Sequence, residues 1–157
     1  MKTFVLLSDT HGNVAAVEKL APIMAEADYV IFLGDGLRDL ARYALGNKEK
    51  FRLAEGNCDF FSSGEREGFM EVEGVKLMFC HGHRYGVKRG LHELLARAKE
   101  ENCTLALYGH THDARVEKID GVTLINPGSM TKFTTKPSYC YLVLHQGKIT
   151  AQIVEIF

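Results

Sequence analysis

The first half of the chain alternates between short, continuous apolar runs and segments with apolar residues at helical spacing. Buried strands are typically apolar runs rich in β-branched and aromatic residues. The runs that predict such strands are Thr3–Ser8, Tyr29–Leu33 and Phe51–Ala54. The helical spacing predicts helices over Asn13–Ala27, with Asn13 as the N-cap, and over Leu37–Ala44. This strand–helix alternation predicts parallel strand pairing with right-handed crossovers.

In the second half, alternating apolar and polar residues turn at pairs of a polar residue and glycine. Such pairs predict hairpins, and they occur at Glu73-Gly74, Asp120-Gly121 and Gln146-Gly147. The last hairpin is expected to run from Tyr139 to Phe157. An amphipathic helix is expected over Val87–Glu101 and a buried strand over Thr104–Tyr108. The two halves together predict an α/β fold of two mixed sheets packed face to face, with helices outside.

Length and composition limit what this chain is expected to do. A length of 157 residues fits a single domain over 1–157 with a core of its own. The 19 basic and 20 acidic residues give a net charge of −1, so we expect no specific nucleic-acid partner.

The four cysteines form no CxxC pair, which favours reduced thiols in the cytoplasm. The N-terminal apolar run is too short for a signal peptide or a membrane helix, so no membrane association is expected. The apolar hairpins leave a homo-oligomer open.

Five of the predicted strands end in loops that contain glycine and side chains able to bind metals. These side chains belong to Asp9, His11, Asp35, Asn57, His81, His110 and His112. Because ligands of open α/β sheets bind beyond the carboxyl ends of the strands, we expect these loops to converge. Two carboxylates, four imidazoles and one amide are too many for one tetrahedral zinc ion, but they suit two five- or six-coordinate ions. Such nitrogen and oxygen ligands favour Mn²⁺, Fe, Zn²⁺ or Ni²⁺ over Ca²⁺.

Each motif alone has a simpler interpretation. Asp9 and His11 could be a helix cap and a surface histidine, Asp35 could belong to a simple turn, and Asn57 is a common turn residue. The pair His110 and His112 is stronger evidence for a metal site, because alternate residues of an extended segment project to the same side. The occurrence of all the motifs at strand ends favours a metal site.

The successive motifs DTHGN, GDG, GNCD, HGH, GHTH and INPGS resemble those of the calcineurin-like metallophosphoesterase superfamily. More narrowly, they resemble the small YfcE-type phosphodiesterases of bacteria and archaea. The matching segment runs from Asp9 to Ser129 and so covers almost the whole chain. The resemblance implies a four-layer α/β/β/α sandwich, in agreement with the hydrophobic pattern.

The resemblance also implies a ligand set for two divalent metal ions. One ion is expected to be held by Asp9, His11, Asp35 and His112. The other is expected to be held by Asp35, Asn57, His81 and His110, with Asp35 bridging. Family members of this size imply Mn²⁺ or Ni²⁺ as the ion, with Zn²⁺ and Fe as alternatives. The implied activity is hydrolysis of a small phosphodiester substrate by metal-activated hydroxide.

The sequence departs from most of the superfamily at Cys58. Most members have a histidine there, which is proposed to protonate the leaving group. Since cysteine is small and often buried, we expect Cys58 to be a structural residue. His83 is the candidate to replace the missing acid, with contact to the substrate phosphate as the alternative. Asn57 and His83 are therefore the candidate catalytic residues.

The lost histidine leaves two other functions open. One is a catalytically weak scaffold that binds protein partners, and the other is a phosphomonoesterase. Arg84, Tyr85 and Lys88 are expected at the rim of the site, where they could contact phosphate or simply be solvated. His92 and His145 are expected at the surface. The segment Asn126–Ser129 is expected to support the metal-binding loops without binding metal itself.

Overall fold

The first sheet joins the N-terminal and C-terminal parts of the chain. The computed structural model describes residues 1–60 and 63–156. In this sheet the strand order is β10-β9-β1-β2-β3. The strands are β1 (Lys2–Leu7), β2 (Tyr29–Phe32), β3 (Phe51–Leu53), β9 (Ser138–His145) and β10 (Lys148–Glu155). The pairs β1–β2 and β2–β3 are parallel, as the strand–helix alternation predicted, whereas β9 pairs antiparallel with β1 and with β10.

The second sheet has the strand order β4-β5-β6-β8-β7. Its strands are β4 (Glu67–Val72), β5 (Val75–Cys80), β6 (Leu105–Leu107), β7 (Arg115–Ile119) and β8 (Val122–Asn126). The pairs β5–β6 and β6–β8 are parallel, and β4 and β7 add antiparallel edges. Both sheets are therefore mixed, as predicted.

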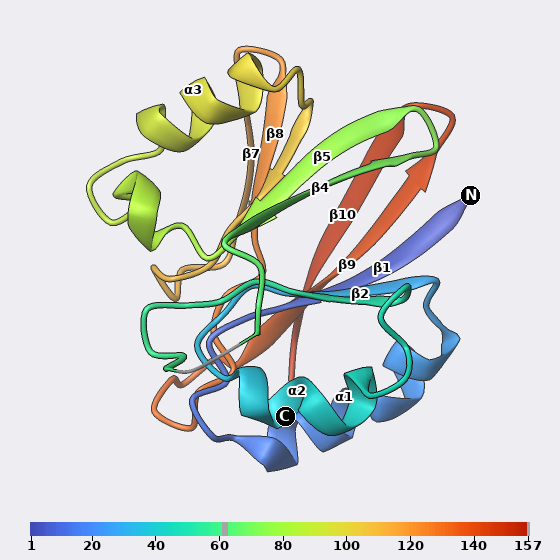
Figure 1. The fold of residues 1–157 in the computed structure, drawn as a ribbon, viewed down its shortest axis with the longest axis vertical. Coiled ribbons are helices and arrows are strands. Elements are labelled where there is room, and N and C mark those ends of the chain that lie inside the picture. The colour runs from blue at the N-terminus through green and yellow to red at the C-terminus, as the bar shows by residue number, and fades with distance from the viewer. Residues whose placement is uncertain (61–62, 157) are drawn as a thin grey trace.

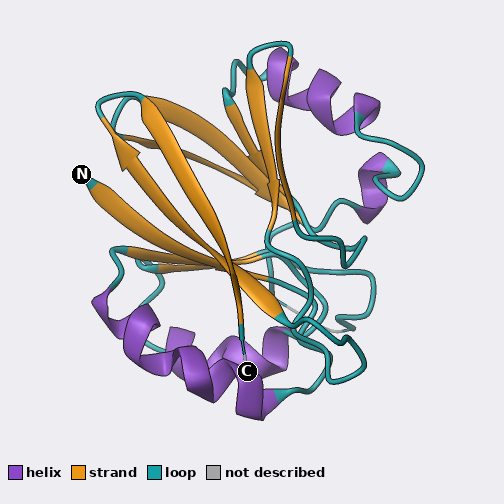
Figure 2. Ribbon diagram, turned by 180° about the vertical axis from the view of Figure 1, so that it is seen from behind, coloured by secondary structure: helices purple, strands orange, loops and turns teal. Residues whose placement is uncertain are grey.

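Within the described residues, helices cover the outer face of each sheet. The helices α1 (Val14–Glu26) and α2 (Leu37–Ala44) lie on the first sheet, and α3 (His92–Glu100) lies on the second (Figures 1 and 2). One apolar core fills the space between the sheets. A second lies between the first sheet and its helices, and a third lies between the second sheet and its helix. The predicted four-layer α/β/β/α sandwich is confirmed.

The three hairpin turns have the backbone conformation that their sequences predict. The first turn residues Glu73, Asp120 and Gln146 have φ values of 52°, 50° and 48°, and a glycine with positive φ follows each one. Two consecutive residues with positive φ match the twist of the strands that they connect. The expected C-terminal hairpin is confirmed up to Glu155, where β10 ends, while Phe157 lies outside the described residues.

The helix that the sequence predicts over Val87–Glu101 begins too early, because the observed helix covers only His92–Glu100. A 3-10 turn, η1 (His83–Tyr85), comes first, and α3 begins only at His92. Gly86 and Gly90 have φ values of 60° and 151°, which no right-handed helix contains. Val87 is nevertheless buried, so the apolar pattern reflects packing against β5 and β6 and not helical structure.

Asn13 caps α1 as predicted, since its side chain accepts a hydrogen bond from the backbone N–H of Ala16.

The loops that follow the parallel strands gather at one end of the sandwich. Figure 2 shows them crowded between the two helical layers on the right of the molecule, while the hairpin turns β4–β5 and β9–β10 point the other way. This convergence follows from the parallel pairing, because parallel strands share a carboxyl edge. Among the described residues, no helix is long and apolar enough to cross a membrane.

Candidate metal centre

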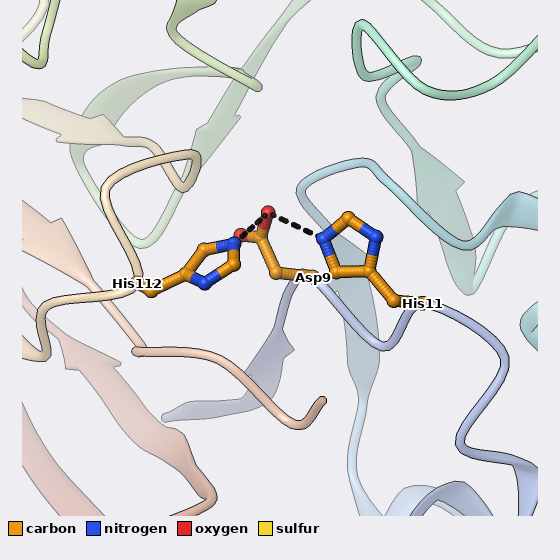
Figure 3. Close-up of side chains that lie close together, drawn as sticks. All are labelled: Asp9, His11 and His112. Atoms are coloured by element: carbon orange, nitrogen blue, oxygen red, sulfur yellow. Dashed lines mark ion pairs between the residues drawn. The ribbon is translucent and has the colours of Figure 1, made fainter. Parts of the chain in front are cut away.

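Asp9 presents one free carboxylate oxygen to two histidines. Its Oδ2 accepts hydrogen bonds from Ser8 Oγ (2.5 Å) and from the backbone N–H of His110 (3.0 Å). Its Oδ1 is buried and has no hydrogen-bond partner among the described residues. This oxygen lies 3.2 Å from Nε2 of His112 and 3.7 Å from Nε2 of His11, and both rings turn toward it (Figure 3).

Asp35 lies between two histidines that come from different loops. Its Oδ2 is 3.7 Å from Nε2 of His11 and 3.3 Å from Nε2 of His81. Its Oδ1 accepts a hydrogen bond of 2.8 Å from the backbone N–H of Cys58. The carboxylate therefore connects the loops that follow β1, β2, β3 and β5.

The ring of His81 is fixed by a backbone carbonyl. Its Nδ1 is 2.6 Å from the carbonyl oxygen of Leu33, and a carbonyl can only accept a hydrogen bond. Nδ1 must therefore carry a proton, which leaves the lone pair of the neutral ring at Nε2. Nε2 faces Asp35 and lies 3.1 Å from Nδ1 of His110. Gly34 permits this approach, since a Cβ there would lie 2.6 Å from His81 Nδ1.

These residues form three overlapping groups of potential ligands. In each group the ligand atoms lie within 4.8 Å of one another, and the groups are Asp9–His11–His112, His11–Asp35–Cys58 and Asp35–His81–His110. The free oxygen of Asp9 and the lone pair of a neutral His81 both point at other electron-rich atoms. Such an arrangement is stable only with protons or cations among them. The donor set of carboxylate oxygens and imidazole nitrogens therefore fits divalent metal ions.

The pKa values of the ion-free centre show how strongly its groups interact. Burial would raise the pKa of Asp9, but the nearby imidazoles of His11, His112 and His81, together with the Ser8 hydroxyl, outweigh burial and lower that pKa. Burial would lower the pKa of His81, but Asp35 and Asp9 raise it above its ordinary value. Burial and the neighbouring His81 lower the pKa of His110 to about 4.

The backbone of the centre is strained at five of the expected ligands. Asp9, His11, Asp35, His110 and His112 have φ values of 54°, 42°, 63°, 71° and 63°. This left-handed region costs a residue other than glycine about 1–2 kcal/mol. Strain of this kind is concentrated at functional sites, where the surrounding structure maintains it. Positive φ at five of the expected ligands is therefore typical of a functional centre.

Comparison with known protein families agrees with this geometry. The family model of the calcineurin-like phosphoesterase superfamily domain matches residues 1–148. The chain belongs to the calcineurin-like phosphoesterase superfamily. Members of this superfamily are hydrolases of phosphoric esters, and the name metallophosphoesterase of several relatives implies divalent metal ions. The resemblance inferred from the sequence motifs is confirmed.

Two curated relatives of this phosphoesterase domain cover most of its length. The probable metallophosphoesterase YsnB of Bacillus subtilis is 30% identical over 154 residues, which cover 96% of this chain and 89% of YsnB. The phosphodiesterase YfcE of Escherichia coli K12 is 28% identical over 155 residues, which cover 83% of this chain and 80% of YfcE.

Solved structures share the fold of the phosphoesterase domain. A predicted phosphoesterase from Streptococcus pneumoniae superimposes with a TM-score of 0.83 at 23% identity, over 98% of this chain and 89% of that one. Vacuolar protein sorting 29 from Cryptosporidium parvum superimposes with a TM-score of 0.74 at 18% identity, over 99% and 97% of the two chains. At these identities the likeness shows the fold alone.

The structure brings six of the seven expected ligands of the phosphoesterase centre together, namely Asp9, His11, Asp35, His81, His110 and His112. Asn57 lies on the loop that donates to Asp35, and its own Nδ2 is 3.5 Å from Cys58 Sγ. Its role as a ligand stays a prediction. His92 and His145 are exposed, as expected.

The structural role expected for Cys58 stays a prediction, but the side chain is not buried, as cysteines often are. Cys58 is exposed, and its sulfur lies within 4.8 Å of ligand atoms of His11 and Asp35. Its loop is held against the centre by the hydrogen bond from the backbone N–H of Cys58 to Asp35 Oδ1. Burial and the nearby Asp35 carboxylate raise the pKa of the thiol, so the ion-free protein carries a protonated Cys58.

His83 lies beside the centre, on the 3-10 turn η1. Its ring centroid is 5.3 Å from that of His81 and 6.0 Å from that of His110. Its Nδ1 is buried and finds no hydrogen-bond partner among the described residues. Burial and the charge of His81 lower the pKa of His83, so the ring is neutral near neutral pH. The ring can therefore donate a hydrogen bond to a ligand from one of its nitrogens.

Two of the three expected rim residues have acidic partners. Arg84 forms an ion pair of 2.9 Å with Glu55, and the hydroxyl of Tyr85 donates a hydrogen bond to Glu67. Contact of Arg84, Tyr85 or Lys88 with phosphate stays a prediction. The loop Asn126–Ser129 supports the centre as expected, since Ser129 Oγ donates to the carbonyl of Asp9.

Two aspartates, Asp39 and Asp59, position the loops that carry the expected ligands, and neither was assigned a role from the sequence, although Asp59 ends the GNCD motif. The carboxylate of Asp59 accepts hydrogen bonds from four backbone N–H groups, those of Asp35, Gly36, Leu37 and Gly56. The carboxylate of Asp39 accepts from Thr10 Oγ1 and from the backbone N–H of Gly12, on either side of His11. Asp59 also caps the N-terminus of α2, since its partner Leu37 is the first residue of that helix.

A cavity of about 590 Å³ adjoins the centre on the side of His11 and Asp35. Its walls combine the acidic loop with apolar side chains of α2, β3 and the loop after β3, which are Leu37, Ala41, Leu53 and Phe60. Arg38 also borders it. The cavity is large enough for an organic substituent next to the potential ligands.

Proposed function

We propose that this chain is a dinuclear-metal phosphodiesterase. The observation that carries the proposal is the position of Asp35 in two groups of potential ligands at once. The first ion is assigned to Asp9, His11, Asp35 and His112, and the second to Asp35, Asn57, His81 and His110. A shared carboxylate is typical of paired ions about 3.5–4 Å apart, which serve the hydrolysis of phosphate esters.

Divalent ions bound there, with Mn²⁺ the first candidate, would stabilise the negative charge on the phosphoryl oxygens and supply hydroxide from water near neutral pH. The protein would contribute by fixing the positions and tautomers of the expected ligands. Leu33 fixes the tautomer of His81, and Asp59 fixes the backbone of Asp35. Because the structure opposes relaxation of the strained loops, little reorganisation is needed during reaction.

His83 is the candidate to act on the substrate directly. Its buried, unpaired Nδ1 and its position beside His81 suit a hydrogen bond to the phosphate or to the leaving oxygen. His83→Ala should slow esters with poor leaving groups more than nitrophenyl esters. A hydrogen bond from the neutral His83 ring to the leaving oxygen predicts this difference, whereas a purely structural role of His83 predicts equal losses for both kinds of ester.

Two observations favour diesters over monoesters. The relative YfcE is named a phosphodiesterase. The cavity beside His11 has apolar walls that suit the second organic group of a diester, which a monoester lacks. The identity of that organic group is a separate question.

The test is hydrolysis of bis-p-nitrophenyl phosphate and of p-nitrophenyl phosphate by ion-free protein with Mn²⁺, Ni²⁺, Zn²⁺ or Mg²⁺ added back. We expect metal-dependent turnover, faster with the diester. Asp35→Asn should lower it by about 100-fold or more, while Asp120→Asn, an exposed carboxylate at a hairpin turn, should leave it unchanged. Faster turnover of the monoester would instead identify a phosphomonoesterase.

A protein-binding scaffold is the second candidate, favoured by the fold that the chain shares with vacuolar protein sorting 29. A scaffold has no physical need for strained, converging ligands. If the protein bound two ions but hydrolysed neither ester with any metal, the scaffold would be the better explanation.

A further inference from the structure

Cys58 differs from the other cysteines of the chain in its surroundings. Cys80, Cys103 and Cys140 are buried in apolar cores, whereas Cys58 is exposed at the mouth of the metal centre. A cysteine of this kind has no packing role to explain its presence. Its chemistry must therefore be considered together with its neighbours.

The sulfur of Cys58 forms a compact group with two expected metal ligands. Cys58 Sγ, a ring nitrogen of His11 and a carboxylate oxygen of Asp35 lie within 4.8 Å of one another. Ligands of one zinc ion, at about 2.3 Å for sulfur and 2.0–2.1 Å for nitrogen, lie slightly closer together than this. A small side-chain rotation would bring all three atoms onto one ion. The hydrogen bond from the backbone N–H of Cys58 to Asp35 Oδ1, at 2.8 Å, keeps the residue in place for it.

A second observation points to a cation at the same position. The free Oδ1 of Asp9 is fully buried and has no hydrogen-bond partner among the described residues. It lies 3.7 Å from Nε2 of His11, and Oδ2 of Asp35 lies 3.7 Å from that same nitrogen. His11 Nε2 is thus placed between two carboxylate oxygens, with the thiol of Cys58 nearby. Oxygen, nitrogen and sulfur donors in one group are typical of sites for thiophilic ions.

We propose that Cys58 is an additional ligand of the first metal position, used by thiophilic ions such as Zn²⁺ or Cd²⁺ and not by Mn²⁺ or Mg²⁺. As the sulfur–metal bond forms, the S–H bond breaks and the proton passes to solvent. With an oxygen-preferring ion the thiol stays protonated and unbound. The inference rests on the metal-binding part of the proposed function and is independent of hydrolysis.

This difference gives the centre a way to respond to the metal that fills it. With a thiophilic ion, Cys58 takes a coordination position that remains open with Mn²⁺. An open position is what a substrate or a water molecule needs in a catalytic metal site. The residue that replaces the family's usual histidine would thus make the choice of metal a control on access to the centre.

The test is a Cd²⁺ titration of the ion-free, full-length protein, followed by the ultraviolet sulfur-to-cadmium charge-transfer absorption, with bound Cd²⁺ measured by equilibrium dialysis. We expect the absorption to rise with the first equivalent of bound Cd²⁺ and to be absent in Cys58→Ser, although this variant still binds Cd²⁺. Cys103→Ser, which changes a buried cysteine in the core beneath α3, should keep the absorption. Mn²⁺ should give no such absorption.

Thiol reactivity provides a second measurement on the unmodified protein. A thiol reagent should label Cys58 as fast with Mn²⁺ as without metal, and at least about tenfold more slowly with Cd²⁺ or Zn²⁺. Bound Cd²⁺ without the charge-transfer absorption, or an absorption that persists in Cys58→Ser, would overturn this inference alone. Failure of the wild-type protein to bind any divalent ion would overturn both the inference and the proposed function.

Discussion

The carboxylate of Asp59 accepts a hydrogen bond of 2.7 Å from the backbone N–H of Asp35, the residue assigned to bridge two ions. Asp59 also accepts from the backbone N–H groups of Gly36, Leu37 and Gly56, so that one side chain joins the loops after β2 and β3. The positions of the expected ligands thus depend on residues that are not ligands themselves, such as Asp59.

Replacement of Asp59 tests that dependence. Asp59→Ala leaves four backbone donors without their acceptor, so we expect a loss of about 2–3 kcal/mol in the free energy of unfolding. We also expect metal affinity about 10–100-fold weaker. Asp59→Asn keeps one acceptor oxygen and should lose less in both respects. Urea unfolding and Mn²⁺ titration measure the two effects.

A matched control for this prediction is Glu18→Gln. Glu18 pairs with Arg42 at an exposed position of α1, where ion pairs contribute about 0–1 kcal/mol. If Asp59→Ala were as stable as Glu18→Gln and bound Mn²⁺ as tightly as the wild type, the positioning role of Asp59 would be wrong.

Gly34 is expected to tolerate no side chain. A Cβ at Gly34 would lie 2.6 Å from Nδ1 of His81 and 2.8 Å from backbone atoms of Gly56, in a residue with φ of 101°. Gly34→Ala should therefore destabilise the fold by about 3 kcal/mol and displace His81 from Leu33. Urea unfolding and Mn²⁺ affinity are the readouts.

Gly46→Ala separates the steric effect at Gly34 from the backbone effect. Gly46 has φ of 73°, and a Cβ there would meet no atom within 4 Å. This variant should lose only about 1 kcal/mol, the cost of the left-handed conformation, and should bind Mn²⁺ normally. Equal losses in the two variants would show that crowding around His81 is unimportant.

Metal ions are expected to stabilise the fold. In the ion-free protein the buried Oδ1 of Asp9 has no hydrogen-bond partner among the described residues, and Nε2 of His81 lies 3.3 Å from Oδ2 of Asp35, so an ion should bind the native state and not the unfolded chain. At a concentration 100 times the dissociation constant, one ion adds about 2.7 kcal/mol. Mn²⁺ should raise the melting temperature, and a chelator should reverse the rise. Asp9→Asn should abolish most of the Mn²⁺-induced rise in melting temperature, whereas Asp120→Asn should leave that rise unchanged. An equal rise in Asp9→Asn would show that Mn²⁺ binds elsewhere.

Acid stability should depend on Glu67. Partial burial would raise the pKa of Glu67, but hydrogen bonds from Arg97 and Tyr85 outweigh it and lower that pKa below its ordinary value of 4.5. A lowered pKa means that Glu67 stabilises the fold above its unfolded-state pKa, and that this contribution is lost as the pH falls toward the folded-state value. Glu67→Gln should therefore be less stable than the wild type by about 1 kcal/mol at neutral pH.

The difference between wild type and Glu67→Gln should shrink steadily below about pH 4.5. Urea unfolding of both proteins over a pH series, with chelator present, measures it. Tyr85→Phe removes one of the two partners and should give an intermediate result. A difference that stays constant into acid would mean that the charge of Glu67 contributes nothing.

Most of the fold could be predicted from the sequence because local signals agreed with tertiary structure. The apolar run before Asp9 is a buried strand, and Glu73-Gly74 turns a hairpin because both residues adopt positive φ. The helix expected from Val87 failed for a physical reason. Val87 is buried by packing, and Gly86 and Gly90 prevent helical structure around it.

The candidate site could be predicted only where its side chains carry recognisable chemistry. His110 and His112 carry recognisable ligand chemistry, whereas Asp59, the last residue of the GNCD motif, acts through backbone N–H groups some twenty residues away, and the motif alone does not reveal that contact. The exposure of Cys58 could not be predicted from the tendency of cysteines to be buried, because the position of its loop depends on a hydrogen bond to Asp35. The left-handed backbone of Asp9 and His11 also follows from tertiary contacts alone.

The most direct test of the dinuclear centre is electron paramagnetic resonance of the ion-free protein during titration with Mn²⁺. A dinuclear centre should bind two ions per chain and give a spectrum with spin coupling between them, because Asp35 belongs to both ligand groups. In Asp35→Asn the coupling should disappear and at most one ion should bind tightly. A single uncoupled Mn²⁺ in the wild-type protein, at saturation, would contradict a dinuclear centre.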